Sequence, residues 1–338
     1  MRKLMLHCEL ALGDIVMLTA AVRDLHRWHP GWFLTDVRTT CAALWDHNPY
    51  LTPLDPDDPG VCHFDCHYPL IHASNELPFH FIHGFIADLN TRLDLQIQPT
   101  EFRGDIHLSP EERAAPSRPA EWAGVDLPYW IIVAGGKRDY TIKWWAAERF
   151  QQVVDHFRHR LLFVQVGDAG DPHPALRGVL DLRGRTDLRD LVRLMHRADG
   201  VVCPVTGIMH LAAAVDTPAD RPPQRACIVV AGGREPPHWE AYPHHQFLHT
   251  VGMLPCCAQG GCWRARTRPL GDGDDNDAPD ALCLDPVGDL PRCMDFITAE
   301  DVIRQIERHC RGGTAQTLDS QQAAAVAAAF ARESATCR

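Results

Sequence analysis

Three short segments of the sequence combine glycine with side chains that can move protons or carry charge. They are Gly13-Asp14, residues 135–145 and residues 206–210. Each follows an apolar run that is typical of a buried strand, and the first and third also precede a helical pattern. Where a strand, a glycine turn and a helix start follow one another, free backbone N–H groups and the helix dipole point at one place. The three segments therefore predict an anion-binding site with titratable groups beside it.

Gly13-Asp14 lies between the first expected strand and the first expected helix. Ligands of open α/β sheets bind outside the carboxyl ends of the strands, and a carboxylate there can deprotonate a hydroxyl as a general base. The alternative is structural, because Asp14 also suits the N-cap of a helix that begins at Ile15. The segment alone leaves both interpretations open.

The second segment, GGKRDYTIKWW, supplies positive charge next to flexible backbone. Its glycines, Gly135 and Gly136, allow close approach of a phosphate, and two of the three lysines of the chain, Lys137 and Lys143, lie here. The spacing is not that of a P-loop. The segment indicates either a phosphate-binding loop or a solvated basic loop.

The third segment offers the Thr206 hydroxyl and the bare Gly207 N–H to a diphosphate at the start of a small-residue helix. It follows the apolar pair Val201-Val202 and a break at Pro204. The structural alternative is a tight turn that packs against that helix.

The elements that must position these segments alternate between strand and helix, which is typical of parallel sheets with helices on their faces. We expect a turn at 9–14, an irregular loop at 53–69 and a domain boundary within 110–128. The expected strands cover 3–6, 32–37, 129–134, 161–166, 201–202 and 227–231, and the expected helices cover 15–28, 79–93, 146–157, 188–198, 298–309 and 323–332.

The composition limits the function classes. A chain of 338 residues has material for two cores, and its net charge of −11 argues against a nucleic-acid partner. We find no apolar run of about 18 residues and no signal-peptide pattern at the start, so we expect a cytoplasmic protein. Its 13 cysteines are then expected to be reduced or metal-bound.

Five cysteines crowd into a stretch rich in glycine, aspartate and proline. Four thiolates can hold zinc or iron tetrahedrally and order such a loop, and a site with four protein ligands is structural because no position stays open for chemistry. The alternative is a set of free thiols in a disordered loop. A second cluster, CHFDCH at 62–67, lacks the haem-attachment spacing and is interpreted as a loop. The five cysteines of the stretch are Cys256, Cys257, Cys262, Cys283 and Cys293.

Taken together and in order, the motifs resemble glycosyltransferase family 9, the heptosyltransferases. The resemblance covers about residues 3 to 310 and rests on four segments: Gly13-Asp14, the loop 135–145, LRGRTDL at 182–188 and TGIMHLAAA at 206–214. It implies an α/β protein of the GT-B fold, in which two Rossmann-like domains face each other across a cleft. The implied divisions are an acceptor-side domain 1–125, a nucleotide-sugar domain 126–312 that includes a Cys-rich metal finger at 255–294, and an Ala-rich tail 313–338.

The resemblance also implies roles for single residues. Asp14 matches the catalytic base, and Lys143 matches the lysine that neutralises the diphosphate leaving group. The donor-binding positions are Gly13, Gly135, Gly136, Lys137, Thr186, Thr206, Gly207, Ile208, Met209 and His210. No catalytic metal is implied.

One difference from the usual family motif indicates which branch of the family the chain resembles. Members that build lipopolysaccharide carry an aspartate before the Thr-Gly pair, where this chain has Val205. The Pro-Val-Thr-Gly-Ile-Met-His version resembles the bacterial branch that heptosylates autotransporter proteins, so the resemblance implies ADP-heptose as donor and a protein serine as acceptor. That branch carries a four-cysteine iron finger, which implies structural iron, or zinc, on Cys257, Cys262, Cys283 and Cys293, with Cys256 spare. The chain is short for that branch and we expect it to lack the branch's extra N-terminal domain, which leaves the protein acceptor and the assembly into a homo-oligomer open.

Other functions stay as alternatives. A transferase that acts on the lipopolysaccharide core or uses another nucleotide-sugar would share these motifs. A nucleotide-sugar epimerase or hydrolase of the same fold would need a further pair of carboxylates near the motifs, and the sequence shows none there. A non-catalytic binding module would not need both Asp14 and Lys143.

Overall fold

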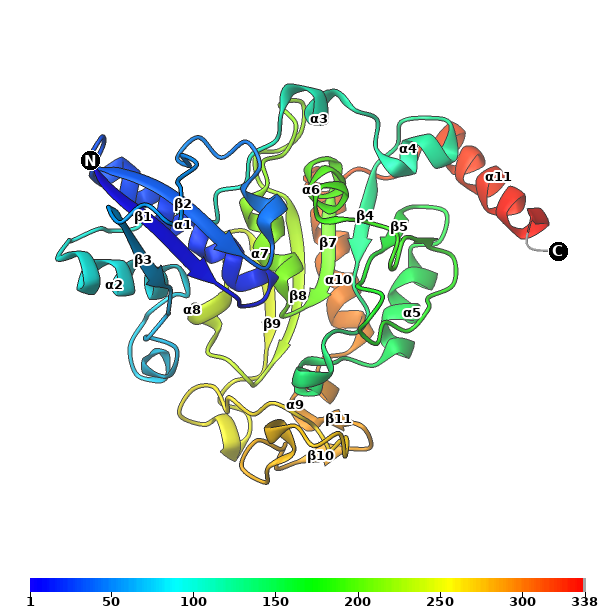
Figure 1. The fold of residues 1–338 in the computed structure, drawn as a ribbon. Helices are drawn as coiled ribbons and strands as arrows, with labels where there is room; N and C mark the ends of the chain where they lie inside the picture. The colour runs from blue at the N-terminus through cyan, green and yellow to red at the C-terminus, as the bar shows by residue number, and fades with distance from the viewer. Residues whose placement is uncertain (337–338) are drawn as a thin grey trace.

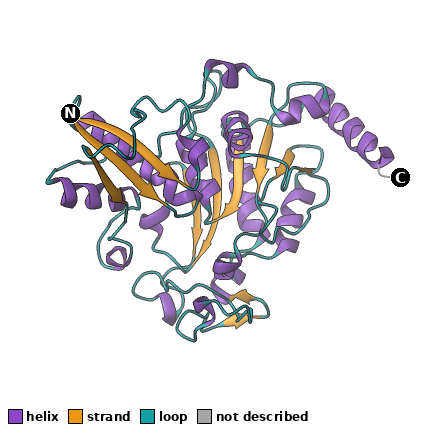
Figure 2. Ribbon diagram, in the orientation of Figure 1, coloured by secondary structure: helices purple, strands orange, loops and turns teal. Residues whose placement is uncertain are grey.

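The computed structural model describes residues 1–336 and contains two parallel sheets (Figures 1 and 2). The first sheet has the order β2-β1-β3, and the second has the order β6-β5-β4-β7-β8-β9. Within both sheets every strand pair is parallel, so each connection must cross over, and the alternation in the sequence is explained. The predicted α/β class is confirmed.

The first sheet is formed by β1 (Arg2–Cys8), β2 (Phe33–Thr39) and β3 (Val61–Asp65), with α1 (Leu12–Trp28) and α2 (Ile82–Leu93) packed beside it. Two expectations are wrong here. The stretch 53–69 is not wholly irregular, because β3 pairs with β1 from Val61 onward. The turn expected at 9–14 ends early, because α1 begins at Leu12 and takes Asp14 into its first turn.

The second sheet is buried on both faces, as the near-continuous apolar strands predict. On one face Trp130, Ile132 and Val202 join residues of α5 and α10 in a core, and on the other Ile131 and Val201 join a core that includes α1, α6 and α7. The strands are β4 (Tyr129–Ile132), β5 (Leu162–Gln165), β6 (Leu180–Asp181), β7 (Gly200–Pro204), β8 (Ala226–Gly232) and β9 (His245–His249). The helices are α3 (Pro110–Ala114), α4 (Arg118–Ala123), α5 (Ala147–His156), α6 (Leu188–Arg197), α7 (Gly207–Ala214), α8 (Pro237–Glu240), α9 (Arg292–Asp295), α10 (Ala299–Arg311) and α11 (Ser320–Thr336).

The two halves meet where the first turns of α1 and α7 touch. A Cβ added at Gly13 would lie 2.7 Å from Cδ2 of His210, and one added at Gly207 would lie 2.8 Å from Cγ of Leu12. Both approaches are closer than a side chain allows, so the two glycines are required by the contact between the helices.

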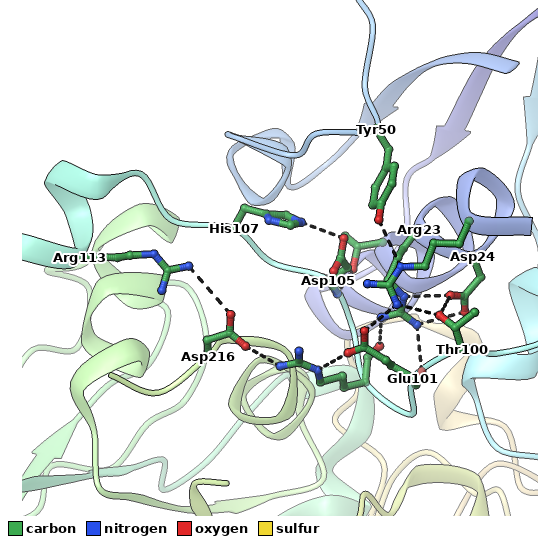
Figure 3. Close-up of polar contacts among 12 residues, drawn as sticks. Arg23, Asp24, Tyr50, Thr100, Glu101, Asp105, His107, Arg113 and Asp216 are labelled. Atoms are coloured by element: carbon green, nitrogen blue, oxygen red, sulfur yellow. Dashed lines mark hydrogen bonds and ion pairs between the residues drawn. The ribbon is translucent and has the colours of Figure 1, made fainter. Parts of the chain in front are cut away.

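A polar network reinforces this junction behind the helices (Figure 3). Arg23 of α1 is fully buried, pairs with Asp24, and donates to the carbonyl oxygens of Glu101 and Arg103 at 2.9 and 2.8 Å. Arg103 in turn pairs with Asp216, just after α7, at 2.6 Å. The segment that leaves the first half is thereby fixed to both halves.

Two further parts lie outside the sheets. The Cys-rich insertion (yellow to orange in Figure 1) packs below the second sheet and holds 3-10 turns, the short hairpin β10 (Pro286–Val287) and β11 (Leu290–Pro291), and the start of α9. The Ala-rich segment forms α11, which rests on α4 through Trp122 and Phe330, whose ring centroids lie 4.8 Å apart. Residues 337 and 338 of the expected tail lie outside the described residues. Within residues 1–336, no helix combines the length and the apolar character that crossing a membrane requires.

Candidate functional site

A cleft of about 690 Å³ lies between the two halves, at the carboxyl ends of β1, β4, β5 and β7. All but one of the predicted catalytic and donor-binding residues line it. The exception is Met209, a residue of α7 whose side chain is fully buried in the core. The residues that do line the cleft are Gly13, Asp14, Gly135, Gly136, Lys137, Lys143, Thr186, Thr206, Gly207, Ile208 and His210.

Asp14 stands on the wall that the first half supplies. Its carboxylate accepts a 3.0 Å hydrogen bond from the backbone N–H of Ala11 and a second hydrogen bond from the Tyr68 hydroxyl. Burial raises the pKa of Asp14 above its usual value, and the hydrogen bond from Tyr68 and the nearby His210 offset the rise only in part. Asp14 therefore makes a cap contact at the third helical position and still faces the cleft with the raised pKa that suits a general base.

Lys143 stands on the opposite wall, at the end of the 3-10 segment Arg138–Lys143. Its Nζ lies 2.7 Å from Oε1 of Glu235 and 5.6 Å from the centroid of the Tyr140 ring. Glu235 also pairs with Arg234, although its side chain is only 3 % exposed. One buried carboxylate thus holds two cations at the edge of the cleft, where a phosphate could take its place.

The N-terminus of α7 completes this wall. Thr206 is the N-cap residue, and its hydroxyl oxygen accepts from the N–H of Ile208 at 3.3 Å. Val205 is buried beside it, so the turn itself carries no carboxylate. The helix N-terminus offers N–H groups and a positive dipole end to an anion in the cleft.

The glycine loop reaches the cleft in a conformation that needs glycine. Gly135 has φ of +123°, and a Cβ there would lie 2.1 Å from the carbonyl oxygen of Pro172. The 171–173 segment therefore packs directly on this loop, and Asp171, His173 and Thr186 line the cleft as well.

Sequence reasoning missed a buried acidic group below His210. Nε2 of His210 lies 3.0 Å from Oε2 of Glu240, and its Nδ1 lies 2.5 Å from the hydroxyl of Tyr242. Burial opposes ionisation of Glu240, but His210, Lys143 and Arg234 outweigh it and hold its pKa well below the usual range.

The expectation that no carboxylate pair lies near the motifs is therefore wrong. Glu235 and Glu240 both line the cleft and are both buried. A signal was available in the sequence for Glu235, which comes two residues after the Gly232-Gly233 turn at the end of β8, whereas Glu240 lies further on, at the end of α8. Each is occupied by a basic partner, so neither is a free acid or base like Asp14.

The five cysteines of the insertion line one small cavity of about 10 Å³, which is about the size of one water molecule or one ion. Burial and the neighbouring thiols raise the pKa of Cys293 to about 12. The Cys257 thiol donates to the carbonyl oxygens of Thr250 and Leu254 at 3.6 and 3.5 Å. Throughout residues 1–336, no three Cys, His, Asp or Glu side chains converge as they would around a metal ion. The predicted ligands are thus gathered in one place but are not arranged as a tetrahedron.

Comparison with known proteins gives one family. Residues 86–219 match the model of glycosyltransferase family 9 (heptosyltransferase). No curated protein matches the chain significantly.

Several solved structures have the same fold. A family 9 glycosyltransferase from Veillonella parvula is 14 % identical, with a TM-score of 0.59 over 91 % of this chain and 96 % of that one. The E. coli ADP-heptose lipopolysaccharide heptosyltransferase II is also 14 % identical, with a TM-score of 0.55 over 90 % and 98 %. The iron-containing dodecameric glycosyltransferase TibC of enterotoxigenic E. coli is 17 % identical, with a TM-score of 0.60 over 92 % and 76 %. The predicted GT-B architecture is confirmed by this likeness.

Proposed function

We propose, from the match of residues 86–219 to the model of glycosyltransferase family 9, that this chain transfers a heptose from ADP-heptose to an acceptor hydroxyl. The heptosyltransferases among its structural neighbours include one named for ADP-heptose. The observation that carries the proposal is that Asp14, Lys143 and the N-terminus of α7 line one cleft from opposite sides.

Asp14 is proposed as the base. The acceptor hydroxyl gives its proton to the Asp14 carboxylate while its oxygen attacks the anomeric carbon of the donor sugar. The bond from that carbon to the diphosphate oxygen breaks, and ADP leaves with the electron pair. Tyr68 and the Ala11 N–H fix the carboxylate in place, so the general base is oriented before the substrate arrives.

Lys143 and the Thr206-Gly207 turn are proposed to stabilise the departing ADP. Negative charge grows on the diphosphate as the bond breaks, and fixed positive groups there lower the barrier more than they strengthen ground-state binding. In the absence of donor, Glu235 holds Lys143, so we expect the diphosphate to compete with Glu235 for the ammonium group.

The acceptor is proposed to be a serine of an autotransporter protein. The support is the Val205 version of the diphosphate turn, together with a Cys-rich insertion beside the cleft. The lipopolysaccharide core is the alternative acceptor. Both offer a hydroxyl that Asp14 could deprotonate, so the chemistry of the cleft is the same for either.

The same resemblance supports a structural iron or zinc ion on Cys257, Cys262, Cys283 and Cys293. The donor set fits in kind and in place, because all four residues line one cavity in an otherwise irregular insertion. The ion would cross-link the insertion through four ligands and supply no chemistry to the transfer. Elemental analysis of the purified protein tests this directly. Stoichiometric iron or zinc that disappears in Cys262→Ser supports the site, and a metal-free protein with an intact fold contradicts it.

The central experiment is a transfer assay with ADP-heptose and two acceptors, an autotransporter passenger and a lipopolysaccharide core. Release of ADP and the mass of each acceptor are recorded. A heptose mass increment on the passenger supports the full proposal, and an increment on the core alone moves the acceptor to the alternative class. ADP-heptose that stays intact with both acceptors, or is isomerised, contradicts the proposed transfer.

A further inference from the structure

One asparagine ties the first half of the molecule to the Cys-rich insertion of the second. The Asn75 side chain accepts hydrogen bonds from the Gly261 N–H at 3.0 Å and from the Trp263 indole N–H at 2.7 Å. It also donates to the carbonyl oxygen of Gly261 at 3.3 Å. Gly260 makes room for it, since a Cβ there would lie 2.8 Å from the Asn75 amide. The side chain thus uses both its acceptor and its donor across the domain junction.

Trp263 connects Asn75 to the cleft. It lines the cleft itself, and its ring lies 5.6 Å from the Arg234 guanidinium. Arg234 pairs with Glu235, the same carboxylate that holds Lys143. A shift of Trp263 would therefore be felt at the cations proposed to stabilise the diphosphate.

The other end of the contact reaches the proposed base. Asn75 closes the 3-10 turn His72–Asn75, which belongs to the same segment as Tyr68 and Phe81. Tyr68 donates to Asp14, and Phe81 stacks on Trp239 with ring centroids 5.1 Å apart. His238 makes a second tie across the junction, with its Nε2 2.7 Å from the carbonyl oxygen of Ser74.

We propose that Asn75 is a positioning residue that sets the distance between the Asp14 wall and the Lys143 wall of the cleft. Its partner Trp263 bears on the diphosphate side, and its own segment holds the Tyr68 that orients the base. This inference rests on the proposed function. It gives the Cys-rich insertion a second task, because the residue next to Cys262 is then part of the cleft.

Paired substitutions test the proposal. Asn75→Leu keeps the branched shape and the number of side-chain heavy atoms and removes all three hydrogen bonds, whereas Asn75→Asp keeps a carboxylate oxygen for the Gly261 and Trp263 donors. Asn90 offers a matched control, because its amide makes the same kind of two-way contact with Ile97, at 2.7 and 2.9 Å, inside the first half alone. Asn90→Leu therefore removes comparable hydrogen bonds without touching the junction.

We expect Asn75→Leu to lower kcat by roughly tenfold to a hundredfold, because a small misplacement of reacting groups has effects of that size. The dissociation constant for ADP should change less than threefold, since the nucleotide is held mainly by the second half. Asn75→Asp should recover most of kcat, and Asn90→Leu should lower thermal stability with kcat unchanged.

The outcomes separate this inference from the proposed function. If Asp14→Asn abolishes transfer while Asn75→Leu keeps the wild-type kcat, the positioning role is wrong and the proposed function stands. If Asn75→Leu and Asn90→Leu lose kcat only in proportion to the fraction unfolded, the contact is merely structural and the inference is overturned. If wild-type protein performs no transfer, the proposed function fails first.

Discussion

The two walls of the cleft handle charge in opposite ways. The wall from the first half presents one carboxylate, Asp14, whose partners are a backbone N–H and a tyrosine hydroxyl. The wall from the second half carries Lys143, Arg234, Glu235 and Glu240 in a network where each charge has a partner of opposite sign or a histidine. A base must be free to take a proton, whereas groups that stabilise a leaving anion must be fixed in advance. The difference between the walls is therefore the division of labour that a direct displacement needs.

Replacing Asp14 tests the wall from the first half and should have the largest effect. Asp14→Asn keeps the shape but removes the base, so we expect kcat to fall by about 10²–10⁴-fold with ADP binding nearly unchanged. Transfer is measured by ADP release, and ADP binding by calorimetry.

A matched control separates the base from the helix cap. Asp301 occupies the same third position of α10, accepts from the Thr298 N–H at 2.8 Å and does not line the cleft. Asp301→Asn should cost stability without lowering kcat. An equal loss of kcat in both variants would mean that Asp14 matters only as a cap.

Replacing Lys143 tests the charged wall. Lys143→Met removes the ammonium group that we propose faces the diphosphate, and we expect kcat to fall by about 10²–10³-fold, as for other groups that stabilise charge in the transition state. Lys3→Met is the control, because Lys3 pairs with Asp58 at the surface and does not line the cleft. A variant at 143 with full activity but a poor fold would remove Lys143 from the mechanism.

Glu240 should matter more for stability than for the rate. Glu240→Gln removes the charge that His210, Lys143 and Arg234 surround, which we expect to lower the free energy of unfolding by about 2 kcal/mol at neutral pH. Because the folded-state pKa of Glu240 is depressed, its contribution is present above the ordinary carboxyl pKa and is lost as the pH falls toward the folded value. Denaturant titrations of both proteins should therefore converge in acid, and a constant difference at every pH would contradict this origin.

Asp14 should show the opposite and smaller effect on stability. Its folded-state pKa is raised, chiefly by burial, so the folded protein loses stability as the pH rises through that value. Asp14→Asn removes this loss, and we expect a slightly higher Tm than wild type at neutral pH, with the gain shrinking in acid. A lower Tm at neutral pH would show that the Ala11 hydrogen bond outweighs the burial of charge.

The fold was predictable because its signals are local. Apolar runs such as 201–202 and helical spacing such as 15–28 mark elements whose order already requires parallel sheets. The prediction was wrong where contacts between segments distant in sequence decide the structure. β3 is half exposed and polar, so only its registry with β1 makes it a strand. Helix α1 begins three residues before Ile15 because Leu12 packs on Gly207, more than 190 residues away in sequence.

The motifs of the candidate site could be predicted from the sequence, but the contacts among its side chains could not. Gly13-Asp14 and Thr206-Gly207 carry their own turn and helix signals, so their type could be read locally. Glu240 and Tyr68 have no such signal, and only the fold brings them beside His210 and Asp14. Met209 shows the converse, since its place in a motif does not tell which face of α7 it occupies.

The contact between Gly13 and Gly207 also bears on how the molecule could admit a large acceptor. When one body rotates about a contact point, each atom moves in proportion to its distance from that point. The two glycines lie at the cleft itself, one residue from Asp14 and one from Thr206. A rotation of the two halves about these glycines would widen the outer rim of the cleft and leave the distances among the proposed reacting groups almost unchanged. A Cβ at either glycine would shift this contact point, and with it the alignment of Asp14 and Thr206 across the cleft.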